Sequence, residues 1–442
     1  MPFTVTLHPP TPLLPDEWLA IHGVEEIVGV FTTPVRHPEV NHNDRAIVGL
    51  VMVAHGMVHT YELSIPILMT IWLDVFEVTP GRLGLVVSIG YALFGLGAIP
   101  SGVLSDRFGS RRLISLALFG MGISFVLLAL APSIPVIALA LVVWGAAASI
   151  YHPSGLSLIS KGVHQRGDAF AYHGMAGNAG IAFGPLATTI LLLFAGWHTV
   201  AVLLAVPALV AALYATRIDF DEAAAVDGDL TDSKADSVTS LGEFVRESKL
   251  LLLSPFVGVI TIMMLSGLYY RGFLTFLPEL LSEFPMFETV TIVERSMEPS
   301  RYVYSVLLMI GMGGQFVGGK LTDRMETEKG LAMAFGVLAV LAVLFLPASR
   351  AGLLPFLIIG GVLGFFLFVV QPLYQATVAE YTPPGTRGLS YGYTYLGVFG
   401  IGAAGAAIAG AVLEFFTAGT LFAVLAAFAL TASIIGTVLT RR

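Results

Sequence analysis

Three ionisable side chains lie close together within one apolar segment of the chain. His55, His59 and Glu62 belong to the stretch 54–63, AHGMVHTYEL. On an α-helix, spacings of four and three residues place them on one face, in a stripe about 60° wide. Imidazoles titrate near neutral pH, and a carboxylate in a low-dielectric setting can also take up a proton. The stripe therefore predicts a site that binds and releases protons.

Two further polar side chains extend this site, each from an apolar segment of its own. A charged group at the centre of a bilayer costs at least about 2.5–3.5 kcal/mol, so such groups tend to face a cavity and carry function. We expect His152 to approach His55, and Arg271 to face the stripe from the other half of the chain. Arg271 can then hold an anionic substrate or compete with the proton for Glu62.

Weaker signals and alternatives surround this prediction. Gln371 and Gln375, four residues apart, are expected to add hydrogen-bonding capacity to the same cavity. A static alternative has each histidine making one hydrogen bond to a neighbouring helix, with Arg271 and Glu62 forming a structural ion pair.

A metal site is the other alternative, because imidazoles four residues apart can chelate an ion. Its ligands would be His55, His59 and His152. The pattern does not require an ion, so we predict no bound metal and no cofactor.

The segments that carry these residues are long enough to cross a membrane. The chain has 442 residues, of which 56% are hydrophobic and 12% charged, against about 25% charged in soluble domains. Continuous apolar runs of about 20 residues predict membrane-spanning helices, whereas β-barrels need shorter alternating segments. We predict an all-α membrane protein with twelve spans, at about 46–73, 81–104, 112–131, 134–160, 168–195, 199–216, 252–281, 302–323, 329–348, 350–378, 386–414 and 417–440.

Charge and cysteine usage narrow the class further. Most of the 22 lysines and arginines fall on the side of the termini, which predicts a multi-pass protein of the cell membrane with both termini cytoplasmic. No basic stripe exists outside the short loops, so nucleic-acid binding is not expected. Cysteine is absent, which excludes disulfides and thiolate metal sites.

The two halves of the chain resemble each other. GVLSDR (102–107) recurs as GKLTDR (319–324), and QRGDAFAYHG (165–174) as TRGLSYGYTY (386–395). The repeat predicts two six-helix bundles related by a parallel pseudo-repeat, with substrate bound between them. The expected parts are a cytoplasmic N-terminal tail, a first bundle, an acidic cytoplasmic linker and a second bundle, at 1–45, 46–216, 217–251 and 252–442.

The stretch SGVLSDRFGSRR (101–112) resembles the cytoplasmic signature of the major facilitator superfamily. The matching residues are Gly102, Asp106, Arg107, Gly109, Arg111 and Arg112 in the first copy, and Gly319, Asp323 and Arg324 in the second. The resemblance implies transport by alternating access. It also implies that Asp106 contacts the start of the eleventh helix while the cytoplasmic side is closed. We expect Gly102 to admit a neighbouring helix closely.

Three shorter stretches are similar to the fosmidomycin-resistance branch of that superfamily, a group of proton-driven drug exporters. The first carries His55, although His59 stands where the branch has an aspartate. SIYHPSG (149–155) and GNAGIAFGPL (177–186) are the other two. The last also resembles the antiporter motif of the fifth helix at Asn178, Gly180, Gly184 and Pro185. Its glycines predict a close-packing face. His173 lies on that face, and we expect it at a helix contact outside the substrate path.

These observations predict a proton-coupled secondary transporter that exports small amphipathic or anionic compounds. Its partners would be a small-molecule substrate, protons and the lipid bilayer, and the chain would act as a monomer. Uptake of a small organic anion or a metal ion on the same fold is the first alternative. A membrane sensor or an intramembrane enzyme is the second, although no catalytic constellation stands out.

Overall fold

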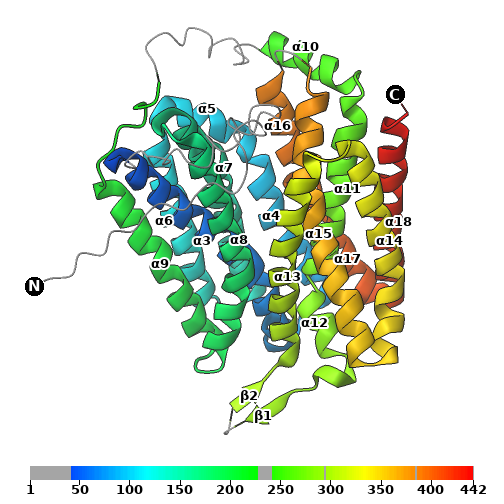
Figure 1. Ribbon diagram of the computed structural model, residues 1–442. Helices are drawn as coiled ribbons and strands as arrows, with labels where there is room; N and C mark the ends of the chain where they lie inside the picture. The colour runs from blue at the N-terminus through cyan, green and yellow to red at the C-terminus, as the bar shows by residue number, and fades with distance from the viewer. Residues whose placement is uncertain (1–40, 227–240, 293–294, 384–385, 442) are drawn as a thin grey trace, which may run out of the picture. The chain divides into compact units, whose positions relative to one another are not determined.

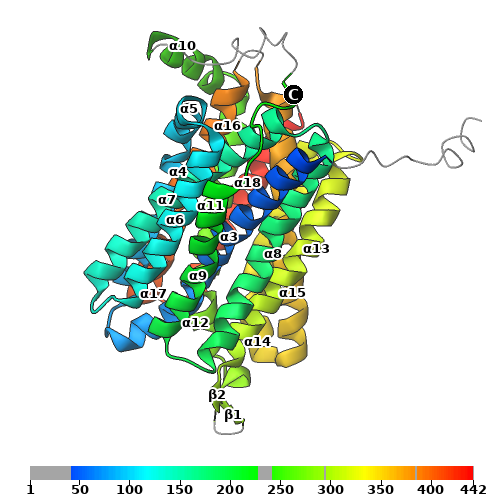
Figure 2. The ribbon, with the colours of Figure 1, turned by 90° about the vertical axis from the view of Figure 1, so that its left-hand side faces the viewer.

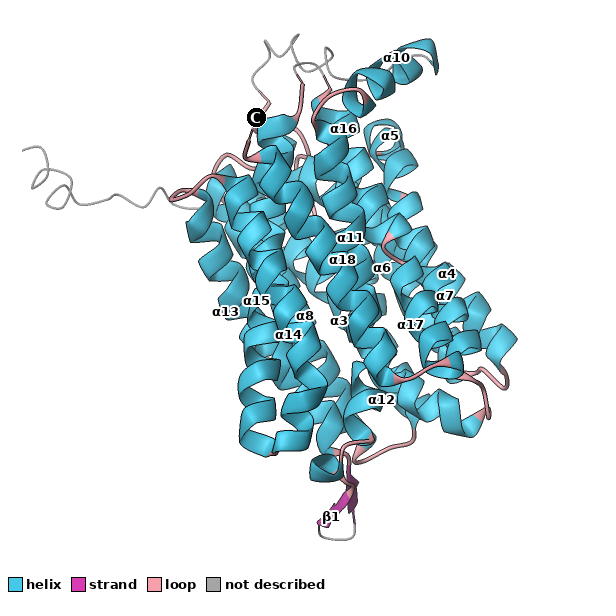
Figure 3. Cartoon of the chain, turned by 90° about the vertical axis from the view of Figure 1, so that its right-hand side faces the viewer, coloured by secondary structure: helices cyan, strands magenta, loops and turns pink. Residues whose placement is uncertain are grey.

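The computed structural model describes residues 41–226, 241–292, 295–383 and 386–441. The predicted N-terminal tail therefore lies almost wholly outside the described residues. Residues 43–442 form one compact unit. Helices make up nearly all of it, as Figure 3 shows, and a single short hairpin accompanies them in the described part.

The first half of the chain contains seven described helices. They are α3 (His42–Val75), α4 (Pro80–Leu96), α5 (Ala98–Phe108), α6 (Ser110–Ala129), α7 (Ile134–Gly162), α8 (Arg166–Leu192) and α9 (Trp197–Arg217). The first span thus begins four residues before the predicted boundary at 46.

The second half begins with the seventh span, α11, together with short elements that the hydropathy pattern does not resolve. They are α10 (Leu241–Leu252), α11 (Phe256–Leu274), α12 (Leu277–Ser282), the 3₁₀ turn η2 (Pro285–Phe287) and the antiparallel strands β1 (Val290–Ile292) and β2 (Arg295–Met297). Helix α10 lies in the segment predicted as a linker, except for its last residue. The seventh span ends at Leu274 rather than at 281, because the chain turns there into the separate helix α12.

The remaining elements complete the second half. They are α13 (Pro299–Thr322), α14 (Thr327–Ala351), α15 (Leu353–Tyr381), α16 (Arg387–Tyr395), the π-helical turn η3 (Leu396–Ile401), α17 (Ala404–Phe415) and α18 (Ala418–Leu439). The predicted eleventh span therefore consists of three successive helical pieces.

Eleven helices of the described chain are long and apolar enough to cross a membrane. The second predicted span is divided between α4, a shorter apolar helix, and α5. Thr79 is the N-cap of helix α4, and its hydroxyl accepts a hydrogen bond from the N–H of Arg82. Gly97 is the C-cap of the same helix. A side chain at Gly97 would collide with the Ser149 hydroxyl, so glycine is required at this junction. With α4 and α5 counted as one span, the predicted twelve spans are matched.

The two ends of the bundle carry different elements. Figure 1 shows β1, β2 and α12 at one end, which we name the hairpin end, and α10 and α16 at the other, which we name the α10 end. In Figure 2, α3 runs from the α10 end towards the hairpin end beside α8 and α9. The outer helices expose apolar side chains such as Val210 (60%) and Leu213 (51%) on α9, as expected for contact with lipid.

Contacts between the two halves follow the sequence repeat. Helix α4 packs against α17 and η3, and α8 packs against α13. In a parallel repeat of six spans, the second and fifth spans correspond to the eighth and eleventh. The contact of spans 2 and 11 and that of spans 5 and 8 are thus equivalent under the repeat, which agrees with two bundles related by a parallel pseudo-repeat.

Candidate functional site

Helix α3 holds His55, His59 and Glu62 in one hydrogen-bonded series, which we name the His–Glu chain. Nδ1 of His59 lies 2.6 Å from Oε2 of Glu62, and Nε2 of His59 lies 3.1 Å from Nε2 of His55. Nδ1 of His55 lies 2.7 Å from the carbonyl oxygen of His173 on α8. The predicted stripe therefore forms a continuous path of hydrogen bonds directed towards the α10 end.

Arg271 of α11 closes the other side of this chain. Its guanidinium forms an ion pair with Oε1 of Glu62, and both side chains are buried, at 3% and 1% exposure. The centroid of the Tyr91 ring lies 3.8 Å from the guanidinium carbon of Arg271. The Tyr91 hydroxyl donates a hydrogen bond to the main-chain oxygen of Glu62 at 3.0 Å. Tyr270 provides a second aromatic face at 5.5 Å. One carboxylate thus links a histidine of the first half to an arginine of the second.

His152 of α7 lies beside the His–Glu chain, as predicted. Its ring centroid is 5.1 Å from that of His55 and 5.6 Å from that of His59. Ligand nitrogens of these three histidines lie within 4.8 Å of one another, so they could hold a metal ion. The aromatic rings of Tyr395 and Phe399 from the second half cover His152.

His173 was expected at a helix contact outside the substrate path, and it lies at the contact of α8 with α3, beside the His–Glu chain. Its ring stacks on His55 with centroids 3.8 Å apart and planes 14° apart. The reason is the close approach of α8 to α3: a side chain on Gly177 would meet the His55 ring, and one on Gly180 would meet the backbone of Gly56. The predicted glycine packing face is confirmed, and the same packing brings His173 into the cluster.

The glutamines and the antiporter-like residues contribute no side-chain hydrogen bond to the His–Glu chain in the described part of the protein. Gln371 is half-buried and Gln375 exposed, and neither makes a hydrogen bond within the described part of the chain. Asn178 is half-buried, while Gly184 and Pro185 are buried. A side chain on Gly184 would meet Thr60 of α3, so this part of the motif also serves helix packing.

Sequence reasoning missed the tyrosines around Arg271. Besides Tyr91 and Tyr270, Tyr304 of α13 is fully buried and interacts electrostatically with Arg271 and Glu62. Its hydroxyl has no hydrogen-bond partner among the described residues. Tyrosines in apolar helices carry no positional signal, and only the tertiary contacts select these three.

The signature between α5 and α6 lies at the α10 end. Gly109 joins the helices with φ +86°, a conformation that favours glycine, and the Glu222 carboxylate accepts hydrogen bonds from the N–H groups of Ser110 (2.7 Å) and Arg111 (3.2 Å). The expectation that Gly102 admits a helix closely is wrong here, because a Cβ there would meet nothing within 4 Å.

The other residues of the signature carry less structural information. The side chains of Asp106 and Arg387 lie outside the described part, so the contact predicted for Asp106 remains a prediction. Arg107 rests on the ring of Phe108, and a side chain on Gly319 would meet nothing within 4 Å. Asp323 caps the end of α13, and Arg324 follows it.

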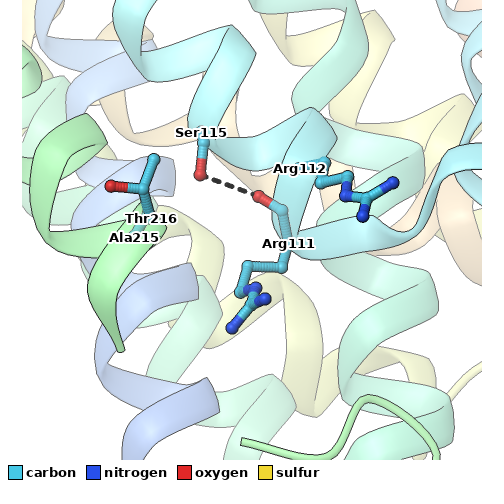
Figure 4. Close-up of a pocket in the computed structure, with 5 residues that line it drawn as sticks. All are labelled: Arg111, Arg112, Ser115, Ala215 and Thr216. Carbon is cyan, nitrogen blue, oxygen red and sulfur yellow. Dashed lines mark hydrogen bonds between the residues drawn. The ribbon is translucent and has the colours of Figure 1, made fainter. Parts of the chain in front are cut away.

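A pocket of about 300 Å³ lies beside this signature, remote from the His–Glu chain. It is lined by Arg111, Arg112, Ser115, Ala215 and Thr216. Figure 4 shows the Ser115 hydroxyl bonded to the Arg111 carbonyl and the two guanidinium groups pointing in different directions. Arg111 donates to the Ile218 carbonyl at 2.9 Å, so this group holds α6 against the end of α9.

Three hydrogen bonds join the two halves at the hairpin end, and we name them the hairpin-end contacts. The Arg295 guanidinium donates to the carbonyl of Leu193 at 3.1 Å. Arg301 donates to the Thr70 hydroxyl at 3.0 Å, and the N–H of Gly81 donates to the Glu414 carboxylate at 3.0 Å. The two halves are therefore held together by hydrogen bonds at the hairpin end.

A helical membrane fold built from two repeated halves is typical of secondary transporters. The chain matches the Major Facilitator Superfamily over residues 48–405. It belongs to that family, and it is a transporter rather than an enzyme. Its spanning helices imply a lipid bilayer, and its family implies a small-molecule substrate.

Solved structures with this fold are transporters of several kinds. A bacterial homologue of the human lysosomal transporter Spinster, inward-facing and unoccupied, is 17% identical, with a TM-score of 0.66 over 90% of this chain and 95% of that one. The nucleoside transporter NupG is 13% identical, with a TM-score of 0.69 over 89% and 99%. A peptide transporter POT in complex with sulfate is 14% identical, with a TM-score of 0.68 over 90% and 95%. The search of curated proteins found no match.

Proposed function

We propose that this protein is a proton-coupled transporter that works by alternating access and exports small amphipathic or anionic compounds. The observation that carries the proposal is the position of Glu62. Its carboxylate pairs with Arg271 of the second half and with His59 of its own helix, inside the buried core. Because protonation removes the charge of Glu62, it weakens the attraction between the halves and links proton binding to their separation.

We propose the orientation from the basic residues of the signature. Arg107, Arg111 and Arg112 lie at the α10 end, which is then the cytoplasmic side of the cell membrane. Both termini are cytoplasmic in this orientation, and the chain acts as a monomer. The hairpin-end contacts then keep the outer side closed. The contact of Asp106 with the start of the eleventh helix is proposed to form when the inner side closes.

Uptake is the second candidate, and one observation favours it. Arg271 is the only strong cation paired with Glu62 in the described part, and a protonated Glu62 would release it to bind an anion. Proton and anion would then occupy the site together and move in the same direction. The convergence of His55, His59 and His152 also keeps uptake of a metal ion open. Accumulation by cells, compared with efflux from them, decides between these directions.

The test of proton coupling is the substitution Glu62→Gln, which keeps the shape of the side chain and removes its charge. A screen of a deletion strain against toxic compounds and nutrients supplies the transported compound. We expect Glu62→Gln to abolish transport driven by a pH gradient in membrane vesicles, with the protein still present in the membrane. The matched control is Glu414→Gln, which changes a carboxylate at the hairpin end and should retain coupling. Full coupling in Glu62→Gln would contradict the proposal.

A further inference from the structure

The hydrogen bonds of the His–Glu chain restrict where its protons can be. A carbonyl oxygen only accepts hydrogen bonds, so the contact between His55 Nδ1 and the carbonyl of His173 requires a proton on that nitrogen. In a neutral His55, Nε2 then carries no proton and accepts. The 3.1 Å contact to His59 therefore requires a proton on Nε2 of His59.

Two arrangements then remain at the other end of the chain. If His59 is neutral, its Nδ1 accepts, and Glu62 must be protonated to make their 2.6 Å hydrogen bond. If Glu62 is a carboxylate, Nδ1 of His59 must donate, and His59 is an imidazolium. When His55 is instead the imidazolium, it donates from Nε2 to a neutral His59, which donates from Nδ1 to the carboxylate. Each case holds one proton more than neutral histidines beside a carboxylate.

Removing this extra proton interrupts the hydrogen bonds of the His–Glu chain. Neutral His59 would donate from Nδ1 to Glu62 and neutral His55 from Nδ1 to the carbonyl of His173. Two unprotonated Nε2 atoms would then face each other at 3.1 Å, where they repel instead of forming a hydrogen bond. The observed contacts are therefore those of the proton-loaded site.

We propose that His55, His59 and Glu62 share one transferable proton, and that the loaded site, with the positive charge of Arg271, fits a ligand bearing one negative charge. This deepens the second candidate of the proposed function, proton-coupled uptake, and rests on it, because it names the number of protons and the charge class of the substrate. The proton is shared over three residues, so it moves without changing the net charge. It leaves Glu62 Oε2 for His59 Nδ1 while the Nε2 proton of His59 passes to His55.

The surrounding groups agree with a net charge of +1. Arg271 contributes +1, and the His–Glu chain with its shared proton contributes zero. Among the described residues, Nδ1 of His152 and Nε2 of His173 are buried without a hydrogen-bond partner, so a charged form would leave a buried N–H unpaired. The other titratable groups that interact with Arg271 or Glu62 are tyrosines, namely Tyr91, Tyr270, Tyr304 and Tyr374.

The Tyr304 hydroxyl is a second indication, besides the net charge of +1, that the site binds an anion. Its buried hydroxyl lacks a partner in the described part of the chain, and it interacts electrostatically with Arg271. A buried hydroxyl without a partner is unfavourable unless a ligand completes it. A carboxylate placed at Arg271 would accept its hydrogen bond. One proton and one such monoanion then cross together without moving net charge.

The experiment counts protons in the full-length protein in lipid nanodiscs at neutral pH and needs no substrate. Infrared spectroscopy measures the fraction of Glu62 that is protonated, from the carboxyl band that Glu62→Gln removes. Nitrogen-15 spectra of histidine-labelled protein measure the imidazolium fraction of His55 and His59, assigned with His55→Gln and His59→Gln. His164→Gln is the control, because it removes an exposed histidine outside the cluster. All amounts are read from the wild type, so a poorly folded variant affects only the assignment.

We expect the three fractions to add up to one proton per chain. A sum of zero, or a sum of two, would overturn the proposal. The result is independent of the test of proton coupling. A sum other than one, together with loss of coupling in Glu62→Gln, removes the one-proton site and keeps the transporter. A sum of one with coupling intact in Glu62→Gln removes the proposed coupling role and keeps the shared proton.

Discussion

Glu62 shows what a single residue contributes to this molecule. Its carboxylate is almost inaccessible, and it pairs with a histidine of the same helix and an arginine of the opposite half. Removing one partner of a buried ion pair costs about 3–5 kcal/mol, because the other charge stays buried and uncompensated. A change in the charge of Glu62 therefore bears on the contact between the halves.

Tyr304→Phe tests whether the unpartnered hydroxyl serves a ligand. Without a partner to lose, the free energy of unfolding should stay the same or rise slightly. The apparent affinity for the transported compound should fall about 10- to 150-fold, since a hydrogen bond to a charged group contributes about 1.5–3 kcal/mol. Thermal unfolding and concentration-dependent transport measure the two effects.

The matched control for that substitution is Tyr61→Phe. The Tyr61 hydroxyl is equally buried but donates to the carbonyl of Leu204 at 2.7 Å. Its removal should lower the free energy of unfolding by about 1 kcal/mol and leave the affinity unchanged. Equal stability losses in both variants, with no change in affinity for Tyr304→Phe, would show that the hydroxyl has only a structural role.

At the residue scale, helical periodicity predicted which side chains of α3 share a face, because their spacing alone determines it. The pairing of Glu62 with Arg271 needed the fold, since the two residues are 209 positions apart. The stacking of His173 on His55 also needed the fold, because periodicity put His173 on the glycine face of α8 but could not say that α3 packs there.

At the scale of elements, the broken helices are the features that hydropathy could not predict. The second span divides at Gly97, and the eleventh contains the π-helical turn η3. Both breaks lie where the two halves meet, since α4 packs against η3. A π-helical turn inside an α-helix often marks a functional site. An apolar run gives only the length of a span, and its average hydropathy hides such interruptions.

Gly95→Ala tests this contact between α4 and η3. A Cβ on Gly95 would collide with the backbone of Phe399 and Gly400, which cannot move away as a flexible side chain can. We expect a loss of about 1–3 kcal/mol in stability and a much lower transport rate, because the closed packing of the halves is blocked. Thermal unfolding in detergent and vesicle transport measure this.

Gly102→Ala is the control on the same predicted span. A Cβ there would meet nothing within 4 Å, and alanine favours a helix over glycine by up to about 1 kcal/mol. Its stability should stay the same or rise, and transport should continue. Similar behaviour of the two variants would mean that the contact at Gly95 is not needed in the transport cycle.

For the whole molecule, the repeat predicted two bundles, and the equivalent contacts of α4 with α17 and of α8 with α13 agree with it. The hairpin-end contacts were not predicted. One of them depends on the loop between the seventh and eighth spans, where neither hydropathy nor a motif indicates that Arg295 reaches Leu193. Such contacts belong to one arrangement of the halves, so they must break when this end opens.

Glu279 of α12 makes this end sensitive to pH. Helix α12 lies beyond the span that ends at Leu274. Burial, followed by the nearby carboxylates of Asp74 and Glu283, raises the pKa of Glu279 to about 7, while Arg301 opposes the increase. The charges come from three sides, since Asp74 belongs to α3, Arg301 to α13, and Glu283 and Glu298 to the adjoining loop segments.

Opening the hairpin end exposes this carboxyl group to water and returns its pKa towards the ordinary 4.5. The closed arrangement then binds the proton more tightly, so its advantage is complete below about pH 4.5 and is lost as the pH rises through 7. The chain has no cysteine, so spin labels at Leu130→Cys and Leu354→Cys report the width of this end. We expect the population with a long label distance to grow between about pH 5 and 8, and Glu279→Gln to remove most of that growth. Glu288→Gln, at an exposed carboxylate of the same end, should leave it unchanged. A pH response that persists in Glu279→Gln would assign the opening to other groups, because the amide cannot titrate.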